Sequence, residues 1–204
     1  MKVGRVDVEG EGGLTAARAA RRSAVLLHGF VVAALAIACA VWWARGAAAA
    51  GEKAAGGAAA VKAAFGEDCE KLLLEALESA RREIRVAIYT FTRRNVSRAL
   101  QEAAERKVKV TVKYDARSMD ESPGMTQVIG YLRNHGVDCV PVKMSGDMAK
   151  MHHKFAVVDG KRVVMGSWNY TVTGTVSNYE NVVSLESADV AKAFSEEFDR
   201  IKDR

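Results

Sequence analysis

Two hydrophobic periods alternate along the chain from about residue 66 to the C-terminus. A period of three to four residues predicts helices at 72–80, 96–104, 125–134 (closed by Gly136) and 190–201. Apolar runs and strict alternation predict strands at 84–91, 108–114, 137–142, 154–158, 163–165 and 182–185. The polar stretch 117–124 is expected to be a loop. This order predicts an α/β fold in which a mixed β-sheet is flanked by helices on both faces.

An uninterrupted apolar run precedes this region. Residues 24–44 contain His28 as their one strongly polar member. As a helix they would be about 30 Å long, which matches the hydrocarbon thickness of a bilayer. Trp42, Trp43 and Arg45 close the run, as is typical of a membrane interface. We therefore expect a single-pass transmembrane helix; a signal peptide cleaved among the small residues 46–50 is the alternative.

The apolar run divides the chain into four segments. Residues 1–23 form a basic segment, and residues 24–44 form the anchor. Residues 45–65 are rich in Ala and Gly and read as a linker. Residues 66–204 are long enough for one domain with its own core.

Charge and cysteine content narrow the possible classes. The net charge is +5, and residues 91–162 carry 14 basic and eight acidic side chains, a net charge of +6. This distribution allows a basic face that binds phosphates, but it is not that of a strongly cationic domain. Three cysteines at wide spacing cannot complete a disulfide framework, so a small disulfide-stapled secreted module is excluded.

The segment 151–181 carries the candidate chemistry. His152 and Lys154 lie two apart in an extended stretch, about 6.6 Å along the chain, so both side chains can meet one phosphate. A turn at Asp159 and Gly160 returns the chain antiparallel. The returning strand brings a further group of residues towards His152. Gly166 allows close backbone approach, Ser167 and Asn169 offer neutral donors, and Glu180 is placed to orient an imidazole.

These residues fill the pattern H-x-K-x4-D-x6-G-S-x-N without a gap. The six fixed positions are His152, Lys154, Asp159, Gly166, Ser167 and Asn169. At about 5% usage per residue type, such a match arises by chance at roughly 10⁻⁸ per starting point. The segment resembles the phospholipase D superfamily. Within it, residues 66–204 are most similar to the branch with a single motif, which contains the Nuc-type endonucleases and the mitochondrial cardiolipin hydrolase (MitoPLD/Zucchini) group.

The resemblance implies a phospholipase D-like catalytic domain and a metal-independent phosphodiesterase that works through a phosphohistidine. His152 would attack phosphorus, Lys154 and Asn169 would hold the phosphoryl oxygens with Gly166 and Ser167, and Glu180 would orient the nucleophile. Asp159 belongs to the same catalytic set, in a supporting role because strand alternation turns it away from His152.

Assembly and cofactors follow from the same resemblance. The family brings two motif copies together, whereas this chain has one motif and no internal repeat. We therefore expect a homodimer with a shared active site. No cofactor and no metal are expected, since Cys69, Cys139 and a histidine lack metal-ligand spacing.

Several other side chains have a structural and a functional interpretation. Arg93, Arg94 and Arg98 either flank the substrate groove or form a solvated helix start. Trp168 is expected to pack in the core and not to stack on a base. Two further histidines are expected to lack catalytic roles: His153 gives packing or polar support, and His135 lies solvated near a helix end.

The motif fixes the reaction but leaves the substrate open. The basic middle region favours an endonuclease on single-stranded nucleic acid. The anchor favours a membrane hydrolase of cardiolipin or another phosphatidyl ester. A non-catalytic tethered dimer is the third hypothesis. The intact motif argues against it. The expected location is a membrane: either the mitochondrial outer membrane or a bacterial inner membrane with the domain in the periplasm.

Overall fold

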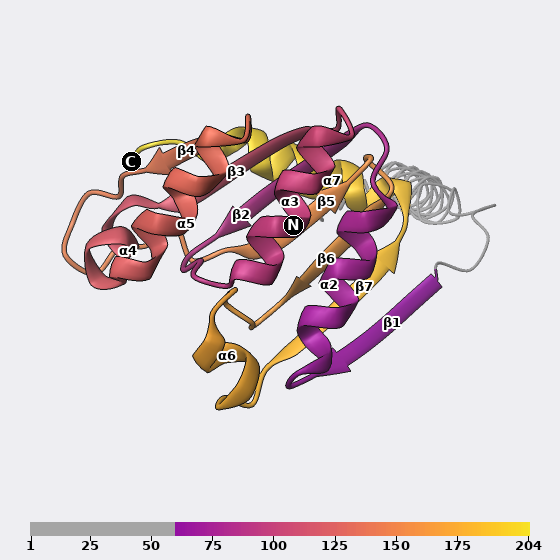
Figure 1. Cartoon of the computed structure of the whole chain (residues 1–204), viewed down its shortest axis with the longest axis horizontal. Helices are drawn as coiled ribbons and strands as arrows, with labels where there is room; N and C mark the ends of the chain where they lie inside the picture. Colours follow the sequence, from indigo (N-terminus) through magenta and orange to yellow (C-terminus); the bar gives the residue numbers. More distant parts are fainter. Residues whose placement is uncertain (1–59) are drawn as a thin grey trace, which may run out of the picture. The chain divides into compact units, whose positions relative to one another are not determined.

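The computed structural model describes residues 60–204, which form one α/β unit of three layers (Figure 1). The strands are β1 (Ala60–Phe65), β2 (Glu83–Ile88), β3 (Lys109–Asp115), β4 (Asp138–Val142), β5 (Lys154–Val158), β6 (Arg162–Gly166) and β7 (Asn181–Glu186). The helices are α2 (Asp68–Ser79), α3 (Arg94–Glu105), α4 (Ala116–Glu121), α5 (Pro123–Asn134), α6 (Val172–Val176) and α7 (Ala188–Arg200).

The seven strands form one mixed sheet in the order β1-β7-β6-β5-β2-β3-β4. Strands β2, β3 and β4 are parallel, and their connections run through α3 and α4–α5. The chain then turns back, and β5, β6, β7 and β1 are antiparallel to their neighbours. The central pair therefore sets the end of β2 beside the start of β5, with Ile88 opposite Lys154.

Helices cover both faces of the sheet, as the sequence predicts. On one face α2, α3 and α5 bury large side chains such as Leu73, Leu100 and Leu132 against the strands. On the other face α7 packs Phe198 against a smaller apolar layer that includes Phe155. Alternation along β5 supplies both layers, because Phe155 and Val157 face α7 while Ala156 and Val158 face the opposite core. Strand β5, which carries Lys154 of the motif, is thus packed on both faces.

Three local expectations are wrong. The expected linker ends earlier, because residues 60–65 pair with β7 as an edge strand. Much of the expected loop 117–124 is helical: Asp115 caps α4 by accepting a hydrogen bond from the backbone of Ser118. The short helix α6 was missed; it follows Thr171, whose hydroxyl accepts from the backbone of Gly174. In each case a side chain or a neighbouring strand forms hydrogen bonds with backbone groups of the element. Hydrophobic periodicity gives no sign of these hydrogen bonds.

The expected transmembrane run, residues 24–44, lies outside the described residues. Within residues 60–204, no helix is both long enough and apolar enough to cross a membrane.

Candidate active site

His152 and Lys154 lie at the edge of the sheet where β2 ends and β5 begins. His152 lies two residues before β5, and its neighbour His153 accepts a backbone hydrogen bond from Tyr89 at 3.0 Å. The Nζ atom of Lys154 lies 3.2 Å from each ring nitrogen of His152 and 3.0 Å from its carbonyl oxygen. The expected convergence of these two side chains is therefore confirmed, although β5 begins only at Lys154.

The environment favours the neutral form of the His152 ring. Partial desolvation lowers the pKa of His152, and the positive charges of Lys154 and Lys150 lower it further. The negative charge of Asp115 opposes this shift in the pKa. A neutral imidazole has the free lone pair that a nucleophile needs.

Burial also lowers the pKa of Lys154, an effect that the charge of Glu180 partly opposes. Lys154 is half-buried, so its amine is held in place beside the imidazole instead of sampling solvent. This arrangement presents a cationic donor and an imidazole to the same point in space. A phosphate oxygen is the natural ligand of such a pair.

Tyr89 completes the wall of the site and was not singled out from the sequence. Its ring centroid lies 5.0 Å from that of His152, and the Nζ atoms of Lys150 and Lys154 lie 5.0 and 5.6 Å from the Tyr89 centroid. The Tyr89 hydroxyl donates to Glu121 at 3.0 Å, which fixes the ring. A tyrosine at the end of a buried strand is the one signal that the sequence offers for this role.

Asp115 is a second residue that sequence reasoning missed. Its carboxylate is 2% exposed and accepts hydrogen bonds from the backbone of Met151 at 2.8 Å and of Ser118 at 3.1 Å. Met151 directly precedes His152. Because buried carboxylates need such partners, Asp115 connects the end of β3 to the segment that carries His152.

The second half of the motif lies on the strand next to β5. The side-chain oxygen of Asn169 accepts a hydrogen bond from the backbone of Thr90 at 3.3 Å, which links the motif to the end of β2. Ser167 donates its hydroxyl proton to Glu180, and Asn178 donates to the same carboxylate at 3.2 Å. Within one chain the Glu180 carboxylate is engaged by Ser167 and Asn178, and its expected role of orienting an imidazole stays a prediction.

Gly166 was expected to let the backbone approach a ligand, but the structure shows another need for glycine at this position. A Cβ atom at this position would lie 2.0 Å from the carbonyl oxygen of Asn181 in β7. The missing side chain therefore permits close approach of the neighbouring strand, not of a ligand. Through this approach Ser167 donates its backbone N–H to Asn181 at 3.1 Å.

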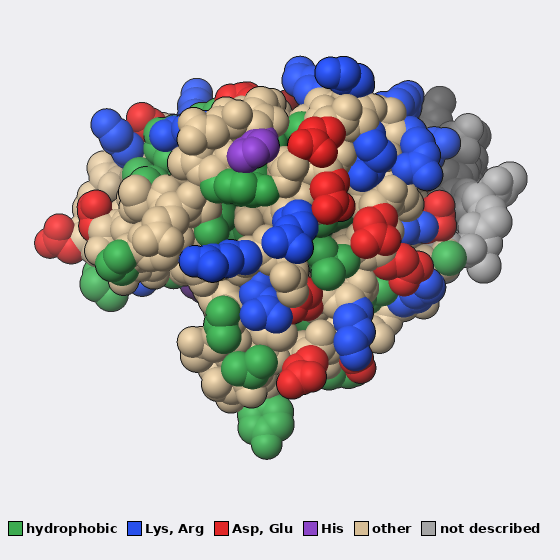
Figure 2. All heavy atoms as spheres, in the orientation of Figure 1, with side chains coloured by type: hydrophobic (Ala, Val, Ile, Leu, Met, Phe, Trp, Pro, Cys, Tyr) green, Lys and Arg blue, Asp and Glu red, His purple; other side chains and the backbone are tan. Residues whose placement is uncertain are grey.

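The arginines after β2 separate into two kinds. Arg93 forms a bidentate ion pair with the buried Glu70, with a shortest distance of 2.7 Å, so it is structural. Arg94 and Arg98 are exposed and line a cavity between α3 and α5. Figure 2 shows Lys and Arg side chains gathered near the start of α3, with Asp and Glu side chains farther along the helix.

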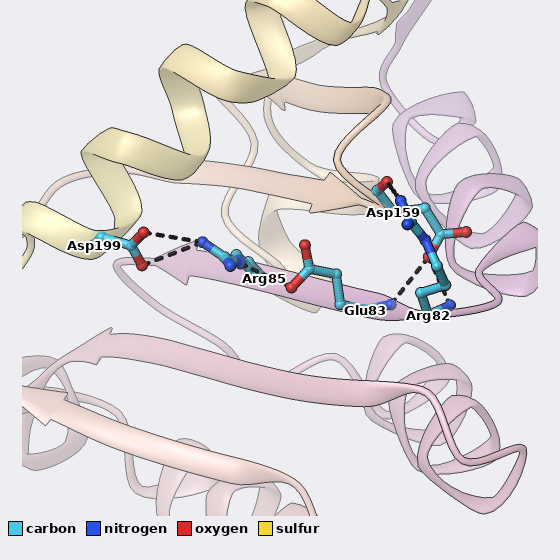
Figure 3. Close-up of polar contacts among 5 residues, drawn as sticks. All are labelled: Arg82, Glu83, Arg85, Asp159 and Asp199. Carbon is cyan, nitrogen blue, oxygen red and sulfur yellow. Dashed lines mark hydrogen bonds and ion pairs between the residues drawn. The ribbon is translucent and has the colours of Figure 1, made fainter.

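Asp159 lies at the opposite end of β5 from Lys154, so its expected place in the catalytic set is corrected. Its carboxylate accepts backbone hydrogen bonds from Arg81, Arg82 and Glu83 at 2.8 to 3.0 Å (Figure 3). Burial alone would raise the pKa of Asp159, but these three amides outweigh it and the net pKa is lowered. Asp159 also adopts a φ of 54°, which an Asp tolerates in a tight turn. Its role is to join the β5–β6 turn to the start of β2.

The expectations for Trp168, His153 and His135 are confirmed. Trp168 is buried in the core at 1% exposure. His153 points towards α7 and lies 3.4 Å from Glu197, and exposed His135 ends α5. Among residues 60–204 no group of three or more His, Cys, Asp and Glu side chains is arranged to hold a metal ion.

Comparisons with known proteins match this domain. Residues 73–202 match the family model "Cardiolipin synthase, PLD-like domain". The chain is 36% identical over 136 residues to a mitochondrial cardiolipin hydrolase of Canis lupus familiaris and 35% identical over 136 residues to that of Homo sapiens. These matches cover 67% of the chain, and they span about half the length of the curated relatives, 51% and 52%.

Two solved structures share the fold. Nuc from Salmonella typhimurium, a phospholipase D family member, superposes with a TM-score of 0.64 at 26% identity, covering 70% of this chain and 93% of Nuc. NucT from Helicobacter pylori gives a TM-score of 0.63 at 25% identity, covering 70% and 96%. Both matches are nearly as long as the solved domains themselves.

Proposed function

Since the chain belongs to the phospholipase D superfamily, in the branch of Nuc and the mitochondrial cardiolipin hydrolases, we propose that it is a phosphodiesterase acting through a phosphohistidine on His152. The observation that carries this proposal is the contact of His152 with Lys154, at 3.2 Å from both ring nitrogens. This contact supports a neutral nucleophile beside a fixed cation. A nucleophile that attacks a phosphate anion requires such a cation beside it.

The proposed reaction uses two copies of His152, one from each chain of a homodimer. In the first step a ring nitrogen of His152 attacks phosphorus, an N–P bond forms and the P–O bond to the leaving alcohol breaks. The partner's His152 gives its proton to the leaving oxygen. In the second step this now neutral imidazole takes a proton from water as the water oxygen attacks phosphorus. The N–P bond then breaks and a phosphomonoester is released.

Other residues of the site have proposed roles in charge stabilisation. Lys154 and Asn169 would hold the non-bridging oxygens as negative charge moves onto them. Ser167, already bonded to Glu180, would serve as a positioning residue for that edge of the site. The lowered pKa of His152 favours the neutral copy that attacks, and the negative charge of the bound phosphate would favour the proton on the partner's copy.

The proposed substrate is single-stranded nucleic acid. The basic side chains near the start of α3 and the likeness to Nuc and NucT support this choice. Cardiolipin or another phosphatidyl ester is the second candidate, supported by the cardiolipin hydrolases among the relatives. With the expected anchor at residues 24–44, either substrate would be cleaved beside a membrane. The two compartments that fit are the mitochondrial outer membrane and a bacterial inner membrane with a periplasmic domain.

The test offers both substrates to the full chain purified in a neutral detergent. Labelled single-stranded RNA, labelled single-stranded DNA and cardiolipin in mixed micelles are each incubated with the wild type and with His152→Ala. We expect cleavage of an oligonucleotide, loss of at least 99% of it in His152→Ala, and no effect of EDTA. His153→Ala is the matched control, because this neighbouring histidine faces α7, and it should stay active.

Three results would contradict the proposal. Retained turnover in His152→Ala would exclude the phosphohistidine, and strong inhibition by EDTA would indicate a metal nuclease. Cleavage of cardiolipin with no cleavage of oligonucleotides would replace the first substrate with the second.

A further inference from the structure

A polar cavity of about 460 Å³ opens between the first turns of α3 and the exposed side of α5. It is distinct from the motif, and the proposed reaction makes no use of it. Its polar lining is formed by Thr92, Arg94, Ser97, Arg98, Gln127 and Tyr131.

Two unneutralised arginines dominate the charge of this cavity. Arg94 and Arg98 lie four residues apart on α3, so they project from the same face of the helix. Within residues 60–204 neither guanidinium has a carboxylate within 4.0 Å, whereas Arg93 next to them is paired with Glu70. Helix α5 contains no acidic residue. A cavity with two free guanidinium groups and no carboxylate favours the binding of an anion. The forked N–H donors of a guanidinium group fit the oxygens of a phosphate.

The cavity is joined to the active site by a short extended segment. Thr90 donates its backbone N–H to Asn169, and Thr92 and Arg93 both donate theirs to the carbonyl of Tyr170 at 2.8 Å. Thr92 itself lines the cavity. From Thr90 to Arg94 the chain spans at most about 14 Å. A substrate bound at His152 that carries a second phosphate can therefore reach both places at once.

We infer that this cavity binds a second phosphate of a single-stranded nucleic acid whose scissile phosphate lies at His152. The inference rests on the proposed function and names its substrate class. The lining favours a nucleic acid over a lipid, because six of its eight residues have polar or charged side chains and its one aliphatic side chain is Val128. Its aromatic member, Tyr131, is 36% exposed and packs on His135 with ring centroids 4.4 Å apart. An exposed, supported ring beside free arginines is the combination on which single-stranded bases stack.

The test measures binding and not cleavage, so that it stands apart from the test of the proposed function. The full chain in neutral detergent carries His152→Ala throughout, and a fluorescent 12-nucleotide single strand is titrated at several salt concentrations. Arg94→Ala/Arg98→Ala should weaken Kd about tenfold, which corresponds to the loss of one charged hydrogen bond. The slope of log Kd against log salt should fall by about 0.7 for each phosphate that the variant no longer neutralises.

Matched variants distinguish the effect of the cavity on binding from the effect of the overall positive charge. Lys109→Ala/Lys192→Ala removes the same charge from exposed positions on β3 and α7, and should change Kd less than twofold. Arg94→Lys/Arg98→Lys should keep most of the salt slope. A dinucleotide with one phosphodiester bond should bind equally well with or without the two arginines, because it has no second phosphate. If the double alanine variant unfolds, Arg98→Gln alone should show a smaller loss of the same kind.

The inference is overturned if the arginine variant binds the 12-nucleotide strand as tightly as the lysine control does. It is also overturned if the arginine variant loses binding to cardiolipin micelles and not to the strand, since the second phosphate would then be that of a lipid. Failure of the wild type to cleave any phosphodiester, with the arginine effect intact, would count against the proposed function alone.

Discussion

The amine of Lys154 lies 3.2 Å from both ring nitrogens of His152, and its positive charge contributes to the lowered pKa of the histidine. Desolvation and the cationic charge of Lys154 both lower the pKa of His152, while Asp115 opposes them. The shift favours the neutral ring of His152. This state of the ring can be measured by titration.

His152 should titrate below its ordinary value of 6.5, as measured by the pH dependence of its ring resonances in NMR. Lys154→Met removes a positive charge, so the pKa of His152 should rise. Asp115→Asn removes a negative charge, so the pKa should fall further. Attack requires the neutral ring, hence the acid limb of kcat/KM should also lie below pH 6.5. Shifts in the same direction for the two variants would contradict this account.

Asp159→Ala should reduce stability with little loss of activity at 25 °C. The substitution removes the acceptor of three backbone amides, at a cost of about 2 kcal/mol, which corresponds to roughly 4–8 °C in Tm. The folded pKa of Asp159 is lowered. Its stabilisation is therefore complete above the ordinary pKa and is lost as pH falls through the folded value. The difference in Tm between wild type and variant should accordingly shrink in strong acid.

Asp159→Asn is the matched variant, because it keeps an acceptor oxygen and tolerates the positive φ. It should be destabilised less than Asp159→Ala. Loss of turnover in a folded Asp159→Asn protein would show that Asp159 takes part in the chemistry after all.

Gly166→Ala should disrupt the sheet beside the active site. A Cβ atom 2.0 Å from the carbonyl of Asn181 forces β6 and β7 apart, which we expect to cost about 3 kcal/mol or more and to displace Ser167. Gly130→Ala in α5 is the control, since nothing lies within 4 Å of its Cβ and alanine favours a helix. Denaturant unfolding would measure both. Equal stability of the two variants would refute the close approach of the strands.

The order of helices and strands could be predicted from sequence because most elements bury a regular apolar face. Residues 108–114 alternate strictly and form β3, and Leu72, Leu73 and Leu77 face the core from α2. Strand β1 could not be predicted in this way, because most of its side chains are exposed and its order comes from pairing with β7. Helices α4 and α6 depend on single capping side chains, which leave little trace in hydrophobic periodicity.

From the sequence, only those site residues could be predicted whose spacing within the motif brings them together. The two-residue separation of His152 and Lys154 implies their meeting, and the turn at Asp159 implies the return of Asn169. Asp115 and Tyr89 lie far from the motif in sequence, and they reach it through the antiparallel pairing of β2 with β5 and the parallel pairing of β3 with β2. The partner of Glu180 was missed because strand alternation does not specify which of several nearby donors a carboxylate accepts from.

The full chain should sediment with membranes and resist extraction at alkaline pH, owing to the apolar run at residues 24–44. Leu35→Arg/Ile37→Arg places two charges in that run, at about 2.5–3.5 kcal/mol each for insertion, and should release the protein. Western blotting of the pellet and supernatant would measure the outcome. A soluble product with a new N-terminus near residue 50 would show instead that the run is a signal peptide.

The most direct test of the account uses a dimer built from one wild-type chain and one His152→Ala chain. Two purification tags, one on each chain, isolate the mixed dimer, and its rate on a single-stranded oligonucleotide is compared with the wild-type rate. Because each phosphorus is proposed to need one His152 as nucleophile and the partner's His152 as acid, the mixed dimer should retain less than about 1% of the activity. If it keeps half of the wild-type rate, each chain owns a complete site and the shared two-histidine mechanism is wrong.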